Sequence, residues 1–87
     1  MVSKKVTIEN PLGLHSRPAT VFLFETKKFS CNIHFQKGER TFDGKSMLDI
    51  LRSATKGGDE IVLICDGADE TEALAALEKV ISEGLGE

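Results

Sequence analysis

The pattern of apolar and polar residues predicts four strands. Apolar and polar positions alternate over residues 5–9 and again over residues 31–36, as they do in a strand with one buried face. Lys37-Gly38 makes a tight connection from the second stretch to a short strand that ends near Phe42. Residues 61–65 are apolar throughout, which is typical of a central strand.

Helical spacing of the apolar residues predicts two helices before the last strand. The first begins at Ser16 and continues to about Lys28, and its Pro18 suits a first helical turn, where no hydrogen bond is lost. A short second helix begins at Ser46, and Asp49 stands at the position of a capping box.

A third helix follows the last strand. Asp69 is its predicted N-cap, Glu72 stands at the capping-box position, and Gly84 ends it. The element order is therefore βαββαβα, and antiparallel sheets commonly pack helices on one face and expose the other. We expect an α+β fold, an open-faced two-layer β-sandwich in which a four-stranded antiparallel sheet carries three helices on one face.

Length and composition indicate one small domain over residues 1–87. A chain of 87 residues buries roughly 60–65% of the surface that its unfolded form exposes, so a single core is feasible. No apolar run approaches the roughly 20 residues that span a bilayer, and residues 1–5 lack the apolar stretch of a signal peptide. We therefore expect a cytoplasmic protein without direct membrane insertion.

The two cysteines, Cys31 and Cys65, do not make a disulfide framework, and no regular Cys/His spacing supports a zinc site. Both stand among apolar residues of predicted strands. Buried free cysteine behaves as a small apolar side chain, so we expect two inert core thiols and no metal site.

Charge is unevenly distributed along the chain, whose net charge is −3. Residues 59–87 contain nine acidic residues and one basic residue, whereas residues 1–58 contain ten basic and five acidic residues. This division suggests one face suited to an acidic partner, although an acidic helix with scattered lysines elsewhere would give the same counts. The negative net charge and the few aromatic residues argue against nucleic-acid binding.

Residues 13–19, Gly-Leu-His-Ser-Arg-Pro-Ala, place His15 directly before a predicted helix. Helix N-termini present unpaired N–H groups and the positive end of the helix dipole, so they favour anions. Arg17 adds a planar, permanently charged donor for phosphate oxygens. Positive potential disfavours imidazolium, and a neutral imidazole has a free ring nitrogen that can act as a nucleophile. The residues alone leave open that His15 is only a capping or surface histidine.

Residues 13–19 resemble the active-site signature of HPr, the histidine-containing phosphocarrier of the bacterial phosphoenolpyruvate:sugar phosphotransferase system, and especially its Gram-positive members. Four further segments resemble the same family. They are Lys45-Ser46-Met47-Leu48, Lys56-Gly57-Gly58-Asp59-Glu60-Ile61, Gly67-Ala68-Asp69-Glu70 followed by Ala73-Leu74, and Gly84-Leu85-Gly86-Glu87. The resemblance therefore covers essentially the whole chain.

The resemblance implies a carrier rather than an enzyme. His15 would accept a phosphoryl group from enzyme I at its δ nitrogen and pass it to IIA components of sugar transporters. Arg17 would steady the phosphoryl group. The resemblance implies no metal or organic cofactor.

Ser46 matches the family's regulatory serine. In Gram-positive relatives a serine kinase/phosphorylase modifies the matching residue, and the product binds a catabolite-control transcription factor. A phosphate at a helix N-terminus is locally favourable, so its effect would fall on docking. A plain N-cap is the alternative role of Ser46.

The resemblance also implies a docking face around His15 and the second helix. Its candidate residues are Ser16, Pro18, Thr20, Lys27, Lys28, Lys45, Met47, Leu48, Leu51 and Arg52. Some of the apolar ones belong to the core instead, because one short helix cannot expose them all. Asp49, Arg52 and Ala54-Thr55 depart from the common family pattern, which leaves the identity of the partner open. The lack of a spare apolar face favours a monomer.

Three other functions compete with the sugar carrier. A regulatory paralogue, of the nitrogen-branch or catabolite-repression type, would keep the same fold without moving sugar. An acyl-carrier-like protein with Ser46 as anchor would be a helical bundle, which the alternation over residues 31–36 contradicts. A ligand-binding module without phosphotransfer is the third.

Overall fold

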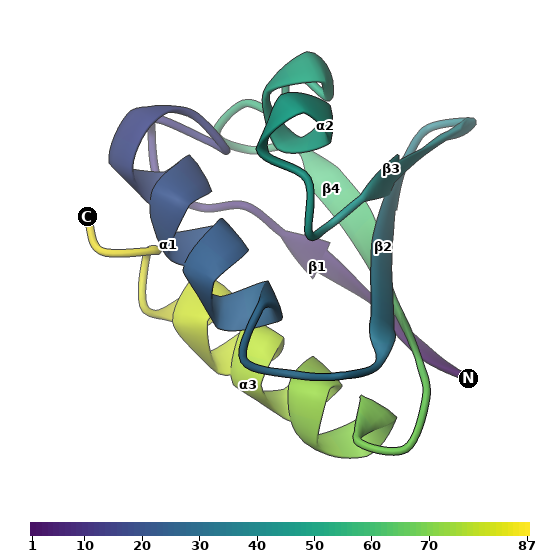
Figure 1. The fold of residues 1–87 in the computed structure, drawn as a ribbon. Helices are drawn as coiled ribbons and strands as arrows, with labels where there is room; N and C mark the ends of the chain where they lie inside the picture. Colours follow the sequence, from purple (N-terminus) through teal and green to yellow (C-terminus); the bar gives the residue numbers. More distant parts are fainter.

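The computed structural model describes residues 1–87 and contains the seven elements expected from the sequence (Figure 1). The strands are β1 (Val2–Thr7), β2 (Asn32–Lys37), β3 (Arg40–Asp43) and β4 (Glu60–Asp66). The helices are α1 (Ser16–Thr26), α2 (Met47–Arg52) and α3 (Glu70–Ser82). The predicted βαββαβα order is confirmed. No helix is long and apolar enough to cross a membrane.

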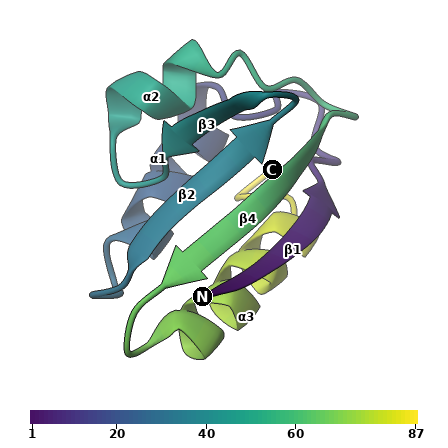
Figure 2. The ribbon, with the colours of Figure 1, turned by 90° about the vertical axis from the view of Figure 1, so that its right-hand side faces the viewer.

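The four strands form one antiparallel sheet in the order β1-β4-β2-β3. The last strand, β4, is thus inserted between β1 and β2, so it has a hydrogen-bonded neighbour on each side. This central position explains its continuous apolar run. α1 and α3 lie side by side on one face of the sheet, α2 lies next to β3, and the opposite face is open (Figures 1 and 2). The open-faced α+β prediction is confirmed.

The core lies between the sheet and the helices. Phe35 of β2 is its centre, with an edge-on contact to Phe22 at 5.7 Å and a stacked contact to Phe42 at 5.3 Å between ring centroids. Along β2 the residues alternate as predicted, since Ile33 is buried and His34 is exposed.

Both cysteines are free thiols in this core, as expected. Burial, and to a lesser extent the nearby Cys31, raises the pKa of Cys65 to about 11. Burial also raises the pKa of Cys31. The two groups are therefore protonated at neutral pH, and a thiol is a far weaker nucleophile than a thiolate.

The predicted bounds of two elements are wrong. β1 runs from Val2 to Thr7 and not from Lys5 to Glu9, because the whole stretch Val2–Thr7 pairs with β4. Its N-terminal residues alternate weakly, and the backbone pairing extends the strand where the side chains do not predict it. α1 ends at Thr26, short of Lys28, where the Thr26 hydroxyl is hydrogen-bonded to the carbonyls of Leu23 and Gly44.

The predicted capping box of α3 is also wrong. Asp69 occupies the N-cap, but its carboxylate accepts hydrogen bonds from the backbone N–H groups of Ser30 and Cys31, at 2.8 and 2.9 Å. Glu70 accepts instead from the N–H of Gly67 at 3.0 Å, and Glu72 makes no capping bond. Asp69 therefore ties the start of α3 to the loop between α1 and β2.

The capping box of α2 is half correct. The Ser46 hydroxyl accepts from the Asp49 N–H at 3.2 Å, as predicted. The Asp49 carboxylate accepts from the Asp43 N–H at 2.9 Å and not from the N–H of Ser46. The bond from the Asp43 N–H replaces the capping-box bond from the Ser46 N–H because β3 ends immediately beside α2.

Candidate functional site

His15 stands at the N-cap of α1, at the end of a tight loop. The Gly13 N–H donates to the Asn10 carbonyl at 3.1 Å, and the Leu14 N–H donates to the Thr55 carbonyl at 3.0 Å. The Leu14 side chain is 1% exposed and anchors the loop in the core, whereas the His15 side chain is exposed. His15 has extended backbone angles and makes no side-chain capping bond. Its imidazole is therefore held near the helix start and is open to solvent.

Two backbone features force the loop into this shape. At Gly13 the φ angle is +62°, and a Cβ would lie 2.2 Å from the Thr55 carbonyl oxygen, so only glycine fits. Ser16 has a φ angle of 53°, a left-handed conformation that costs an L-residue about 1–2 kcal/mol. Strain of this kind persists where the surrounding contacts determine the backbone, and it occurs often at functional sites.

The first turn of α1 is electrostatically uncompensated. It contains no acidic residue and no capping side chain. Arg17 is exposed, and none of the ion pairs in the structure involves it. A Cβ at Gly86 would come within 3.5 Å of the Arg17 Nε, so the C-terminal residues pack closely beneath this side chain. The helix dipole and the guanidinium together make a site for an anion beside His15.

A depression of about 220 Å³ lies next to the imidazole. It brings the His15 loop together with the segment that follows α2, and its lining residues are Pro11, Leu12, His15, Leu51, Ala54, Thr55 and Lys56. Its walls are largely apolar, and Lys56 contributes a cation. No local pattern in the sequence predicts this depression, because the two segments meet only in the folded chain.

Ser46 is half-buried at the start of α2. The Asp49 carboxylate also lies 3.5 Å from Arg52, and the Asp43 carboxylate accepts from the Lys45 N–H at 2.8 Å. Asp43 and Asp49, whose carboxylates are both held by backbone N–H groups, thus stand three residues before and three residues after Ser46 in the chain.

The candidate docking residues on α1 and at its C-cap differ in exposure. Ser16, Thr20 and Lys27 are exposed, whereas Pro18 is fully buried and serves the helix start. Phe24 was missed by the sequence analysis, although it is 65% exposed. The signal was available, since residues 17, 20, 24 and 27 recur at helical spacing and form one exposed stripe.

The candidate docking residues near α2 differ as well. Leu48 and Leu51 are 66% and 41% exposed, whereas Met47 is half-buried against the core. Arg52 is exposed beside Asp49. The Lys45 ammonium donates to the Phe29 carbonyl at 2.6 Å, so this cation is already engaged within the fold. Lys28, two residues beyond the end of α1, is likewise paired, with Glu25 at 3.1 Å.

Known proteins of one family match this chain over nearly its whole length. Residues 2–83 match the family model for the PTS HPr component phosphorylation site. The HPr-like protein Crh of Bacillus subtilis is 34% identical over 83 residues, which cover 95% of this chain and 98% of that protein. The phosphocarrier protein HPr of Neisseria meningitidis serogroup A is 34% identical over 87 residues, covering 100% and 98%.

Solved structures show the same fold. The structure of HPr-C-His from Thermoanaerobacter tengcongensis matches with a TM-score of 0.98 at 34% identity, covering 100% of this chain and 98% of that one. A crystal structure of Crh, described as a dimer with a swapping domain, matches with a TM-score of 0.76 at 33% identity and covers 97% of each chain. On the sequence, the fold and the family model together, the chain belongs to the HPr family of phosphocarriers of the phosphotransferase system.

Proposed function

We propose that this phosphocarrier accepts a phosphoryl group from enzyme I on His15 and passes it to IIA components of sugar transporters. One observation carries the proposal. His15 is an exposed imidazole at a helix N-terminus that has no acidic residue, next to the unpaired Arg17. The starts of α2 and α3 contain carboxylates in their first turns, so only α1 offers an uncompensated positive end.

The chemistry is a reversible displacement at phosphorus. The lone pair of the His15 Nδ1, the nitrogen used in the family, forms a P–N bond while the bond from phosphorus to the donor atom of enzyme I breaks. The electron pair of the broken bond stays on the donor. Arg17 and the free N–H groups of the first turn of α1 then bind the phosphoryl oxygens. Transfer to the IIA component breaks the P–N bond in the same manner.

Enzyme I and the IIA components would dock on a shared face. Phe24, Leu48 and Leu51 present exposed apolar surface, and Arg17 and Lys27 add cations without carboxylate partners. Such a face fits a partner with an apolar centre and an acidic rim.

Ser46 would be the regulatory site of this face. Its modification by a serine kinase/phosphorylase would add about −2 charges next to Leu48 and so oppose the docking of acidic partners. Binding of the modified form to a catabolite-control transcription factor belongs to the same proposal. Crh-like relatives support a regulatory branch of the family, and the choice of acceptor decides between that branch and sugar transport.

The test is phosphoryl transfer from enzyme I and phosphoenolpyruvate, followed by intact mass measurement. The unmodified chain is expected to gain one acid-labile phosphoryl group, and the His15→Ala variant none. A folded chain that gains no mass with an active enzyme I would refute the proposal. Light scattering on the same sample tests the expected monomer against a dimer like that described for Crh.

A further inference from the structure

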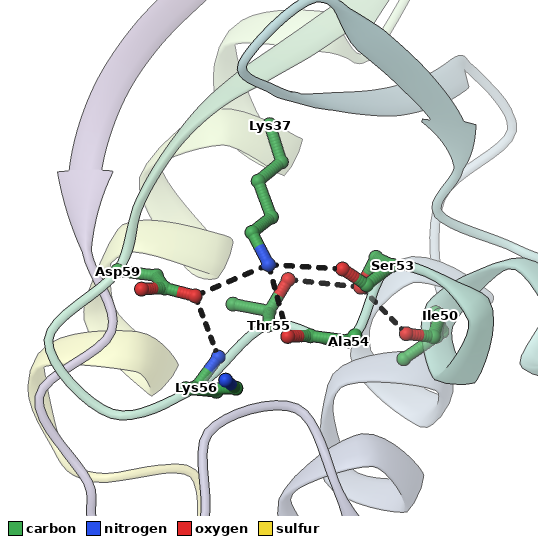
Figure 3. Close-up of polar contacts among 7 residues, drawn as sticks. All are labelled: Lys37, Ile50, Ser53, Ala54, Thr55, Lys56 and Asp59. Carbon is green, nitrogen blue, oxygen red and sulfur yellow. Dashed lines mark hydrogen bonds and ion pairs between the residues drawn. The ribbon is translucent and has the colours of Figure 1, made fainter.

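Lys37, the last residue of β2, makes an unusually complete set of contacts for a lysine. Its ammonium donates to the carbonyl oxygens of Ser53 and Ala54, at 3.0 and 2.9 Å, and lies 3.2 Å from the Asp59 carboxylate. Figure 3 shows these partners converging on one nitrogen from two sides. An ammonium has three N–H donors, and all three have a partner here.

These contacts cross-link a segment that is otherwise strained. Ala54 has a φ angle of 51°, a conformation that L-residues seldom adopt. The neighbouring Ser53 hydroxyl donates to the Ile50 carbonyl at 2.7 Å and shares a hydrogen bond of 2.8 Å with the Thr55 hydroxyl (Figure 3). The Lys37 ammonium binds the carbonyl of Ser53 and that of Ala54, which belong to the two peptide groups on either side of the Ala54 Cα, and it therefore favours this backbone conformation.

The same segment supports the phosphoryl-acceptor loop. The Thr55 carbonyl accepts from the N–H of Leu14, the residue immediately before His15. The Asp59 carboxylate that pairs with Lys37 also accepts from the Lys56 N–H at 2.8 Å. Lys37 therefore binds Ala54, on one side of Thr55, directly and is linked to Lys56, on the other side, through the Asp59 carboxylate.

The segment also forms one wall of the depression beside His15. Ala54, Thr55 and Lys56 line it together with Pro11 and Leu12 of the His15 loop. A change in the backbone at Ala54 would thus alter both the support of His15 and the shape of the surface that a partner meets there.

We propose that Lys37 is a positioning residue for phosphoryl transfer, whose ammonium holds residues 53–56 in the conformation that supports Leu14 and shapes the depression beside His15. This inference rests on the proposed function, since it assigns Lys37 a part in that reaction. Lys37 does not touch the phosphoryl group and acts only through the Thr55 carbonyl and the loop.

The test compares Lys37→Met with Lys5→Met. Both replace a lysine by an uncharged chain of similar length, and Lys5 points from β1 with only a 4.0 Å contact to Glu60. Lys37→Met is expected to slow His15 phosphorylation by enzyme I about tenfold, because small displacements of reacting groups are costly. The amide signals of Leu14 and His15 should shift in its NMR spectrum. Lys5→Met should change neither.

Three outcomes are separable. If Lys37→Met only lowers the midpoint of urea unfolding, while its transfer rate and the Leu14 and His15 signals match those of the unmodified protein, the positioning role is refuted. If Lys37→Met does not fold, Asp59→Asn, which removes the ion pair alone, is expected to give the same signal shifts and a smaller loss of rate. Absence of transfer in the unmodified chain refutes the proposed function itself and, with it, this role.

Discussion

The N-terminal ends of α1 and α3 differ in whether acidic side chains complement the positive end of the helix dipole. At the start of α3, Asp69 and Glu70 accept hydrogen bonds from backbone N–H groups, and the helix end is internally complemented. At the start of α1 there is no carboxylate, and His15 and Arg17 stay exposed. The contrast shows that the fold can complement a helix start with its own side chains and does not do so where a phosphoryl group would bind.

The pKa values of the carboxylates report how firmly the α3 start is held. The Ser30 N–H is the main cause that holds the pKa of Asp69 below its ordinary value of 3.8. The Gly67 N–H and then the chain's N-terminal ammonium lower the pKa of Glu70. Both carboxylates are therefore charged at neutral pH, and their charge stabilises the folded state.

The largest expected effect comes from placing an acidic residue in the first turn of α1, where α3 has one. Arg17→Glu should slow phosphorylation of His15 at least about a hundredfold, since it replaces a phosphate donor by a like charge. The same change should leave the free energy of unfolding unchanged or raise it by about 0.3–1 kcal/mol, because an acid in the first turn complements the dipole. Transfer kinetics and urea unfolding measure the two quantities. Arg40→Glu, on β3, is the control, and an equal loss of transfer there would disprove a local role for Arg17.

Removing the negative charge of Asp69 at the start of α3 should lower stability and leave phosphoryl transfer unchanged. Asp69→Asn is expected to lower the free energy of unfolding at pH 7 and to leave the rate of phosphoryl transfer unchanged. Because the folded-state pKa of Asp69 is lowered, its contribution is present above pH 3.8 and is lost as the pH falls below that value. The difference between the two proteins in urea unfolding should therefore shrink in acid. A difference that persists unchanged at pH 2 would show that the charge is not its source.

The start of α2 lies between these cases, since Ser46 is flanked by carboxylates. Asp49→Asn should raise the rate of Ser46 phosphorylation by a cognate kinase about fivefold, because the Asp49 N–H binds the Ser46 hydroxyl and like unit charges about 4 Å apart repel each other by about 1 kcal/mol even in water. Quantitative mass spectrometry of the phosphoserine product measures this rate. Asp66→Asn, which changes an exposed carboxylate on β4, is the control. Equal rates for the unmodified chain and Asp49→Asn would show that the Asp49 carboxylate does not oppose the modification.

The smallest expected effect concerns the strain beside the α1 start. Ala54→Gly should raise the free energy of unfolding by about 0.5–1 kcal/mol, because glycine adopts the left-handed conformation of Ala54 without strain. Ala75→Gly, at an exposed position within α3, is the matched control and should lower it by about 1 kcal/mol. Urea unfolding measures both variants. If both lose stability alike, the conformation at Ala54 is not a source of strain.

The sequence accounts for more of the fold than of the site. Residues 31–36 and 61–65 were correctly predicted as strands, because alternation and continuous apolarity depend only on which faces are buried. The start of α1 was also predicted, since Pro18 and the preceding residues are local signals. The predicted set of docking residues was incomplete on α1, because Phe24 was assigned no role although its spacing placed it beside Thr20.

The choice of hydrogen-bond partner was the least predictable property. The sequence favoured a local capping box for Asp69, but the folded chain brings the N–H groups of Ser30 and Cys31 to its carboxylate. A hydrogen bond contributes only about 1 kcal/mol net, so a distant donor that needs a partner can displace a local one. For the same reason, the sequence does not predict the contacts of Lys37 with Ser53 and Ala54.

By itself the sequence determined the element order, the alternation that assigns β2 its buried face, and the placement of His15 before a helix with Arg17 in its first turn. These features depend on residues within a few positions of one another. The tertiary structure alone decided the insertion of β4 between β1 and β2, the partner of each polar group, and the depression beside His15. Such features depend on segments that meet only after the core has formed, and neither periodicity nor local spacing specifies that meeting.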